Sequence, residues 1–184
     1  MNPYIEELQQ RTQETGRGEW ENVRVGKETS LRRELVDKYA WAIPNDEAID
    51  TLCNYSPILE IGCGNGFWAS RIRGFGGEVT AIDADPPNDT WTRVQKGTHN
   101  SIPEYDEHSL FLCWPSNNQS WTKEAVEMYE GNTLIYIGEG HGGNTGSCEF
   151  HETVSRKFGL ADEVIDIPSW QSVSDKMYVF EAEN

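Results

Sequence analysis

Several patterns that mark other protein classes are missing from this sequence. The four cysteines, Cys53, Cys63, Cys113 and Cys148, contain no C-x-x-C pair, so they indicate neither a zinc site nor a disulfide framework. The longest apolar run, residues 110–114, is far shorter than a membrane-spanning helix, and the first residues lack the basic start and apolar stretch of a secretion signal. We therefore expect no membrane segment and no metal site, and we predict a cytoplasmic protein with reduced, mostly buried cysteines.

Basic side chains are also scarce. Lysine and arginine total 15 against 31 aspartates and glutamates, which gives a formal net charge of −16. Such a surface repels phosphate, so nucleic acid is a less favoured partner than a small molecule. Proteins of halophilic organisms carry the same kind of charge whatever they bind, because it keeps them soluble, and this origin stays open.

The length limits the chain to one principal domain. Its 184 residues leave little room for a separate substrate lobe, while 36% hydrophobic residues and seven tryptophans supply ample material for a core. We divide the chain into a polar N-terminal arm, residues 1–30, and a single domain over residues 31–184. The arm carries a short helix marked by Tyr4, Ile5 and Leu8, and we expect it to be the least ordered part.

Apolar strand patterns alternate with helical ones through the domain, which predicts a parallel sheet covered on both faces. The expected strands are residues 57–61, 78–83, 93–95, 109–113, 133–137, 164–167 and 176–180. The expected helices are residues 31–40, 45–53, 67–72, 121–129 and 147–158.

Three glycines follow the first expected strand. Gly62, Gly64 and Gly66 let the backbone adopt positive φ and approach a ligand closely, and the next helix points free N–H groups at the same place. Asp83 ends the second strand, 19 positions beyond Gly64, where a carboxylate can accept both hydroxyls of a ribose. The pair predicts an adenosine-type ligand.

The dinucleotide fingerprint G-x-G-x-x-G fits this turn poorly. Read from Gly62, its last glycine falls on Phe67, and read from Gly64 it passes only in the weaker form that ends in Ala69. An NAD(P)-binding Rossmann oxidoreductase therefore stays an alternative.

The same segment resembles motif I of the class I S-adenosylmethionine-dependent methyltransferases, in which an acidic residue and one apolar residue precede G-x-G-x-G. Residues 60–66 carry that pattern, and Asp83 matches the ribose-binding acid of the family. The resemblance covers about residues 39–181 and implies a three-layer α/β/α Rossmann-like methyltransferase fold. Its sheet is seven-stranded and mostly parallel, with an antiparallel last strand. Further segments resemble a group of poorly characterised methyltransferase-like proteins: residues 39–44, 67–69, 112–115 and 137–139.

The resemblance implies S-adenosyl-L-methionine as the cofactor. Where the family commonly has an adenine-binding carboxylate after the third strand, this chain has Thr98, which departs from the pattern and leaves adenine recognition to Thr98, His99 or the backbone. The residues expected at the cofactor are Glu60, Gly62, Cys63, Gly64, Gly66, Asp83, Ala84, Thr98, His99, Trp41 and Tyr39.

The end of the fourth strand faces the methyl donor in this family, and here it reads Cys-Trp-Pro-Ser over residues 113–116. The acidic or amide residue and second proline of DNA amino-methyltransferases are absent. Cys113 lacks the preceding proline of the cytosine-carbon enzymes and any basic neighbour in sequence, so core packing is the favoured interpretation. Trp114 is a candidate wall of the acceptor pocket, with packing under the glycine turn as its alternative.

Two residues of the glycine-rich segment 138–144 are catalytic candidates beside Trp114. Glu139 is a candidate for orienting the acceptor or ordering the loop, and His141 for a catalytic base. Tyr39 and Trp41 either form a lid over the donor or pack in the core.

The favoured function is in-line methyl transfer to an unidentified acceptor, for which a small molecule is the favoured class, and this reaction needs little beyond positioning. A non-catalytic S-adenosylmethionine-binding module is the alternative beside the oxidoreductase. The sequence leaves the oligomeric state open.

Overall fold

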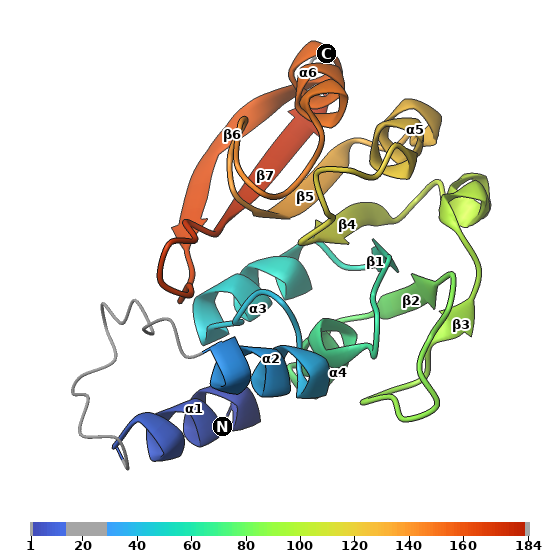
Figure 1. The fold of residues 1–184 in the computed structure, drawn as a ribbon. Helices are drawn as coiled ribbons and strands as arrows, with labels where there is room; N and C mark the ends of the chain where they lie inside the picture. The colour runs from blue at the N-terminus through green and yellow to red at the C-terminus, as the bar shows by residue number, and fades with distance from the viewer. Residues whose placement is uncertain (1, 14–28, 183–184) are drawn as a thin grey trace.

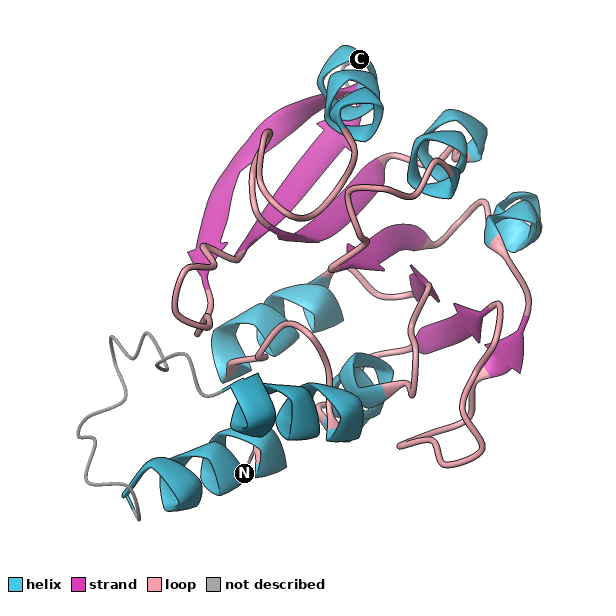
Figure 2. Ribbon diagram, in the orientation of Figure 1, coloured by secondary structure: helices cyan, strands magenta, loops and turns pink. Residues whose placement is uncertain are grey.

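A computed structural model describes residues 2–13 and 29–182 of the chain. Its elements alternate between strand and helix along most of the sequence and build one seven-stranded sheet between two helical layers, as Figures 1 and 2 show. The predicted α/β/α class is confirmed. The strands are β1 (Ile58–Ile61), β2 (Val79–Asp83), β3 (Gln95–Lys96), β4 (Ser109–Cys113), β5 (Thr133–Gly138), β6 (Phe158–Asp166) and β7 (Lys176–Ala182). The helices are α1 (Pro3–Gln13), α2 (Thr29–Lys38), α3 (Asp46–Asn54), α4 (Phe67–Gly74), the 3₁₀ helix η2 (His99–Glu104), α5 (Trp121–Met128) and α6 (Cys148–Lys157).

The strands lie in the order β3-β2-β1-β4-β5-β7-β6. Neighbouring strands from β3 to β5 are parallel, whereas β7 runs antiparallel between β5 and β6. The predicted antiparallel last strand is therefore correct. The chain order reverses between β1 and β4, and ligands of open parallel sheets bind beyond the carboxyl ends of the strands at such a reversal.

The two faces of the sheet carry separate apolar clusters. Helices α3 and α4 cover one face, where Ile49 and Trp68 pack against Phe111 of β4. Helices α5 and α6 cover the other, where Val126 and Phe150 pack against residues of β1, β4 and β5. Strands buried on both faces explain the continuous apolar runs that identified β1 and β4 in the sequence.

A third cluster joins the N-terminal helices to the carboxyl end of the sheet. Tyr4 and Leu8 of α1 are fully buried in it, and the Tyr4 ring stacks on Tyr39 with 4.7 Å between ring centroids. Trp170, from the segment between β6 and β7, closes the cluster. Helix α1 corresponds to the short helix expected around Tyr4, Ile5 and Leu8, and it is packed against the domain. Residues 14–28 of the arm lie outside the described residues.

The region between β2 and β4 departs most from the expected alternation. β3 is only two residues long, and the helix before β4 is the 3₁₀ helix η2, which contains Pro103. Proline has no backbone N–H to donate, which suits a short helix better than a long one. Among the described helices, none is long and apolar enough to cross a membrane.

Candidate functional site

The glycine turn leaves the carboxyl end of β1 and is fastened to β2. The backbone N–H groups of Gly62 and Cys63 both donate to the carbonyl of Ile82, at 2.8 and 3.2 Å. Gly64 has φ +56°, and no described atom lies within 4 Å of the place where a Cβ would stand. The turn therefore presents bare backbone to an open space, as close approach to a ligand requires.

The carboxylate of Asp83 lies against this turn. Its Oδ2 accepts a hydrogen bond from the Gly64 N–H at 2.8 Å, and its Oδ1 accepts one from the Asp85 N–H at 2.9 Å. A carboxylate has about four acceptor positions, so each oxygen keeps capacity for a further donor. The parallel pairing of β1 with β2, with Ile61 opposite Ile82, brings these sequence-distant groups together.

A hollow of about 220 Å³ opens beside the turn, between the ends of β1 and β4 and the segment after α2. Glu60 lines it and is almost fully buried, and its Oε2 has no hydrogen-bond partner among the described residues. Burial raises the pKa of Glu60 to about 8. The indole N–H of Trp68, which also lines the hollow, is likewise without an acceptor in the described part of the chain. The hollow thus offers one buried acceptor and one buried donor.

Both cysteines of the hollow are poor nucleophiles. Burial raises the pKa of the Cys63 and Cys113 thiols well above their ordinary value, and the nearby carboxylate of Glu60 adds to the effect. A thiol without a thiolate fraction cannot attack a ring carbon. The packing interpretation of Cys113 therefore fits its surroundings.

Trp114 follows β4 and separates two spaces. It lines the hollow on one side and a larger cavity of about 640 Å³ on the other. Its ring stacks on Trp41 with centroids 4.7 Å apart and planes within 10° of parallel. Its indole N–H donates to Oδ1 of the buried Asp175 at 2.9 Å, and its backbone has a positive φ of 53°. A bulky residue in this conformation is strained, and such strain persists where its surroundings over-determine it.

The two lid candidates have different surroundings. Tyr39 lines the hollow but is 3% exposed, and its hydroxyl donates to Glu7 at 2.7 Å. Trp41 is 51% exposed and lines both spaces. Tyr39 therefore has the contacts of a core residue, and Trp41 the position of a cover.

The backbone carbonyl of Lys38, the last residue of α2, connects this helix to the glycine turn by a hydrogen bond. It accepts hydrogen bonds from the Asn65 side chain at 3.1 Å and from the Trp91 indole at 2.8 Å. The Trp91 backbone N–H donates in turn to the Asn65 carbonyl at 2.9 Å. Helix α2, the glycine turn and the loop after β2 thus share one anchor.

Glu139 orders its loop. One carboxylate oxygen accepts hydrogen bonds from the backbone and side chain of Asn144, and the other accepts from the Ser174 N–H at 3.0 Å. Burial raises its pKa, but these hydrogen bonds outweigh burial and hold the pKa below its ordinary value. Both oxygens are engaged, so the loop-ordering interpretation fits better than contact with an acceptor.

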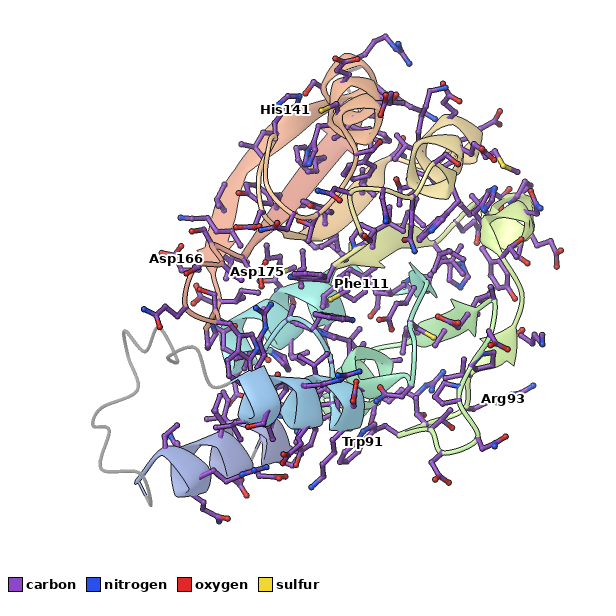
Figure 3. All side chains as sticks on the ribbon, viewed as in Figure 1. Trp91, Arg93, Phe111, His141, Asp166 and Asp175 are labelled. Carbon is purple, nitrogen blue, oxygen red and sulfur yellow. The ribbon has the colours of Figure 1, made fainter. Side chains whose placement is uncertain are left out.

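His141 lies elsewhere. It lines a separate cavity of about 570 Å³ beside α6, with its ring centroid 5.6 Å from that of His151. Figure 3 shows it near α6, well apart from Asp175. The sequence placed His141 on the ligand side because its loop follows β5, but the loop carries it toward α6. We therefore correct that expectation and leave His141 out of the site.

The predicted adenine side contains a residue that the sequence analysis missed. The Thr98 hydroxyl accepts a hydrogen bond from the Asn100 N–H and caps η2, and Ala84 is exposed just beyond Asp83. His99 pairs with Glu124 at 3.1 Å and stacks on Trp121. The Trp121 ring lies close to Gly62, since a Cβ added to this glycine would stand 3.2 Å from the ring. Its place at the start of α5, at the carboxyl end of the sheet, was the signal available.

Metal ligation has no support within residues 2–13 and 29–182, where no group of three or more histidine, cysteine or acidic side chains could hold an ion.

Several solved structures of similar fold are methyltransferases. No known protein family profile and no curated protein matches the sequence. The 1,6-didemethyltoxoflavin N1-methyltransferase of Burkholderia thailandensis, solved with its substrate and S-adenosylhomocysteine, aligns with a TM-score of 0.55 and 12% identity over 91% of this chain and 93% of that chain. Magnesium protoporphyrin IX methyltransferase of Synechocystis, with bound S-adenosylmethionine, gives 0.52 and 11% over 90% and 87%. The N-methyltransferase NodS of Bradyrhizobium japonicum, with S-adenosylhomocysteine, gives 0.51 and 15% over 85% and 98%.

The chain has the fold of the class I S-adenosylmethionine-dependent methyltransferases. In this methyltransferase fold, the antiparallel β7 between β5 and β6 distinguishes the sheet from the parallel sheet of dinucleotide-binding enzymes. The reversal of strand order at β1 and β4 coincides with the glycine turn and the hollow beside it. The site expected from the sequence thus lies at the place where such sheets bind ligands.

Proposed function

We propose that the protein is an S-adenosylmethionine-dependent methyltransferase that acts on a small molecule. The observation that carries the proposal is the 2.8 Å hydrogen bond between Asp83 and the Gly64 N–H, since it holds a carboxylate with free acceptor capacity against an exposed backbone turn. The methyltransferases of similar fold, two of them named for small-molecule substrates, support the reaction class. The net charge of −16 supports a small acceptor over nucleic acid.

The residues at the turn fit the parts of this donor. Asp83 has free acceptor capacity for the ribose hydroxyls, and Gly64 leaves room for the ligand. The unpartnered Oε2 of Glu60 suits the positively charged amino group. The Trp121 ring provides an aromatic face on the adenine side. The remaining predicted contacts on this side are Gly62, Cys63, Gly66, Ala84, Thr98 and His99.

The chain's own part in the reaction is positioning. When bound, S-adenosylmethionine supplies a methyl carbon on a cationic sulfur, and the sulfur keeps the bonding electrons as the acceptor's lone pair takes that carbon. The Trp114 ring, between the hollow and the larger cavity, attracts a cation through its π face. Holding the two reactants in line replaces a dedicated base when the accepting atom is already nucleophilic.

Calorimetric titration with S-adenosylhomocysteine tests the donor site. Asp83→Ala removes charged hydrogen bonds worth about 1.5–3 kcal/mol, so the affinity should fall roughly ten- to a hundredfold. Asp85→Ala is the matched control, because the Asp85 side chain is 97% exposed and contacts only Lys96 at 3.8 Å among the described ion pairs. Equal affinity of the Asp83 variant and the control would remove Asp83 from the site.

Two alternatives are separated by further measurements. A thermal-shift comparison with NAD and NADP tests the oxidoreductase, because a ligand that binds only the native state raises its melting temperature. Donor binding with no methylated product across broad pools of small molecules would favour a non-catalytic module.

We infer a cytoplasmic location. All four cysteines are free thiols, as expected for a reducing compartment.

A further inference from the structure

The larger cavity lies directly beyond the predicted donor position. At about 640 Å³ it has the size of a small-molecule site. It shares part of its wall with the hollow beside the glycine turn, and the shared residues are Val36, Asp37, Trp41 and Trp114. The two spaces therefore border each other at these residues, and a molecule held in the larger cavity lies next to the predicted donor position.

The aromatic wall of this cavity favours a flat ligand. The indoles of Trp41 and Trp114 are parallel within 10°, and half of Trp41 is exposed. A planar ring can extend such a stack, whereas a saturated ring of similar size cannot. The guanidinium of Arg32 lies 5.9 Å from the Trp41 ring centroid and 5.9 Å from that of Trp170, so its orientation is set by two aromatic faces.

The charge of the cavity favours an anionic ligand. Arg32 and Arg33 both line it, and neither takes part in an ion pair with a carboxylate of the described residues. The Nε atom of Arg32 is buried without a hydrogen-bond acceptor in the described ranges. In a chain with twice as many acidic as basic side chains, two such arginines facing one cavity leave positive charge to be matched by a ligand.

A single negative charge fits the surroundings better than two. Asp37 also lines the cavity, and Glu139 and Asp175 are close enough to Arg32 to interact with it electrostatically. These carboxylates oppose a dianion such as a phosphate monoester. A guanidinium pairs with one carboxylate through two parallel hydrogen bonds.

We propose that this cavity binds the methyl acceptor, and that the acceptor is a planar aromatic molecule with one carboxylate, held by Arg32 and Arg33 against the Trp41–Trp114 stack. The assignment to the acceptor rests on the proposed methyltransferase function. The preference for an aromatic carboxylate rests on the cavity alone.

Ligand-observed NMR titrations test this preference with 4-hydroxybenzoate and indole-3-carboxylate, each beside its own carboxamide, and with cyclohexanecarboxylate and phenyl phosphate. Each titration is run with and without saturating S-adenosylhomocysteine. We expect each aromatic acid to bind at least tenfold more tightly than its amide and than the saturated acid. Equal affinities for acid and amide, or tighter binding of phenyl phosphate, would overturn the proposal.

Arg32→Gln should weaken binding of the acids at least tenfold and leave the amides unchanged. Arg93→Gln is the matched control, since Arg93 is exposed and lines none of the cavities described above. Arg33→Gln, at the exposed second arginine of the cavity lining, repeats the test if the Arg32 variant does not fold. An arginine-to-glutamine change that leaves acid affinity at the Arg93→Gln level refutes the role of that arginine.

The two proposals fail differently. If S-adenosylhomocysteine binds wild type and Arg32→Gln equally while no aromatic acid is preferred, the acceptor inference is wrong and the donor site stands. If S-adenosylhomocysteine does not bind wild type, the proposed function is wrong, and the titrations without it still decide whether the cavity selects aromatic acids.

Discussion

The indole N–H of Trp114 donates to the carboxylate of Asp175 at 2.9 Å, although 61 positions separate the two residues. The Trp114 backbone N–H also donates, to the Ile137 carbonyl at 2.8 Å. The residue is therefore held at its backbone and at its indole nitrogen, which is how a tryptophan with φ 53° keeps a conformation that costs about 1–3 kcal/mol. This restraint fixes Trp114 at the border of the hollow and the larger cavity.

Two substitutions of Asp175 distinguish the contribution of its hydrogen bond to stability from the contribution of its charge. Asp175→Ala leaves a buried indole N–H without an acceptor, so the free energy of unfolding should fall by about 1–3 kcal/mol. Asp175→Asn keeps an acceptor oxygen for Trp114 and should lose much less. Urea unfolding at pH 8 compares the three proteins, and an asparagine variant as unstable as the alanine variant would contradict this role.

The same residue gives a pH dependence with a defined sign. Burial raises the pKa of Asp175 to about 7, far above that of an unfolded chain. Between about pH 4 and pH 7 the folded state binds the extra proton, so this carboxyl favours folding at low pH and its contribution is lost as pH rises to 7. The free energy of unfolding of wild type, relative to that of Asp175→Asn, should therefore decrease from pH 5 to pH 8 and then stay constant. Unfolding curves across that range give the difference, and an opposite slope refutes it.

Glu60 should release a proton when the donor binds. Its pKa of about 8 in the free protein means that it is mostly protonated at pH 7, and a cationic amino group beside it favours the ionised form. Calorimetry at pH 7 in buffers of different ionisation enthalpy should detect the release, and affinity should rise toward pH 8. Glu60→Gln should abolish the release and serves as the control. Proton uptake by wild type would mean that the amino group of the donor does not lie beside Glu60.

Two glycines of the turn should respond differently to the same change. A Cβ on Gly64 points into open space, so Gly64→Val should block the donor while costing only the strain of φ +56°, about 1–3 kcal/mol. A Cβ on Gly66 would stand 2.8 Å from Val94, so Gly66→Val should be more destabilising. Melting temperatures and S-adenosylhomocysteine titrations measure both effects. If the Gly64 variant binds S-adenosylhomocysteine with normal affinity, the donor does not bind at the turn.

Tyr39 and Trp41 form a matched aromatic pair for the lid question. Tyr39→Ala opens a cavity in the core, with an expected loss of about 3–5 kcal/mol in stability. Trp41→Ala removes a half-exposed ring and one stacking contact, so it should cost only about 0.5–1.5 kcal/mol in stability. It should nevertheless weaken the binding of S-adenosylhomocysteine tenfold or more. Unfolding and binding measurements on both variants test this division, and equal losses of stability would contradict it.

That Asp83 lies beside the glycine turn was predictable from the sequence, because it depends on local pattern and on parallel pairing. Positive φ at Gly62, Gly64 and Gly66 is a local requirement that only glycine meets without strain. The position of Asp83 beside them follows from two adjacent parallel strands of similar length, which a strand-turn-helix-strand sequence specifies.

The larger cavity was not predictable in the same way. Arg32, Trp114 and Asp175 come from α2, the end of β4 and the segment before β7, and only the tertiary packing brings them together. The spacing of apolar residues along the sequence contains no information about such a contact. The misplaced His141 has the same cause, since the direction of a glycine-rich loop depends on hydrogen bonds such as those between Glu139 and Asn144.

The Lys38 carbonyl, with Asn65 and Trp91 bound to it, has a bearing on turnover. Under the proposed function, S-adenosylhomocysteine leaves the hollow past α2, the glycine turn and the loop after β2, which all meet at this one carbonyl oxygen. We therefore expect product departure to be slower than methyl transfer itself.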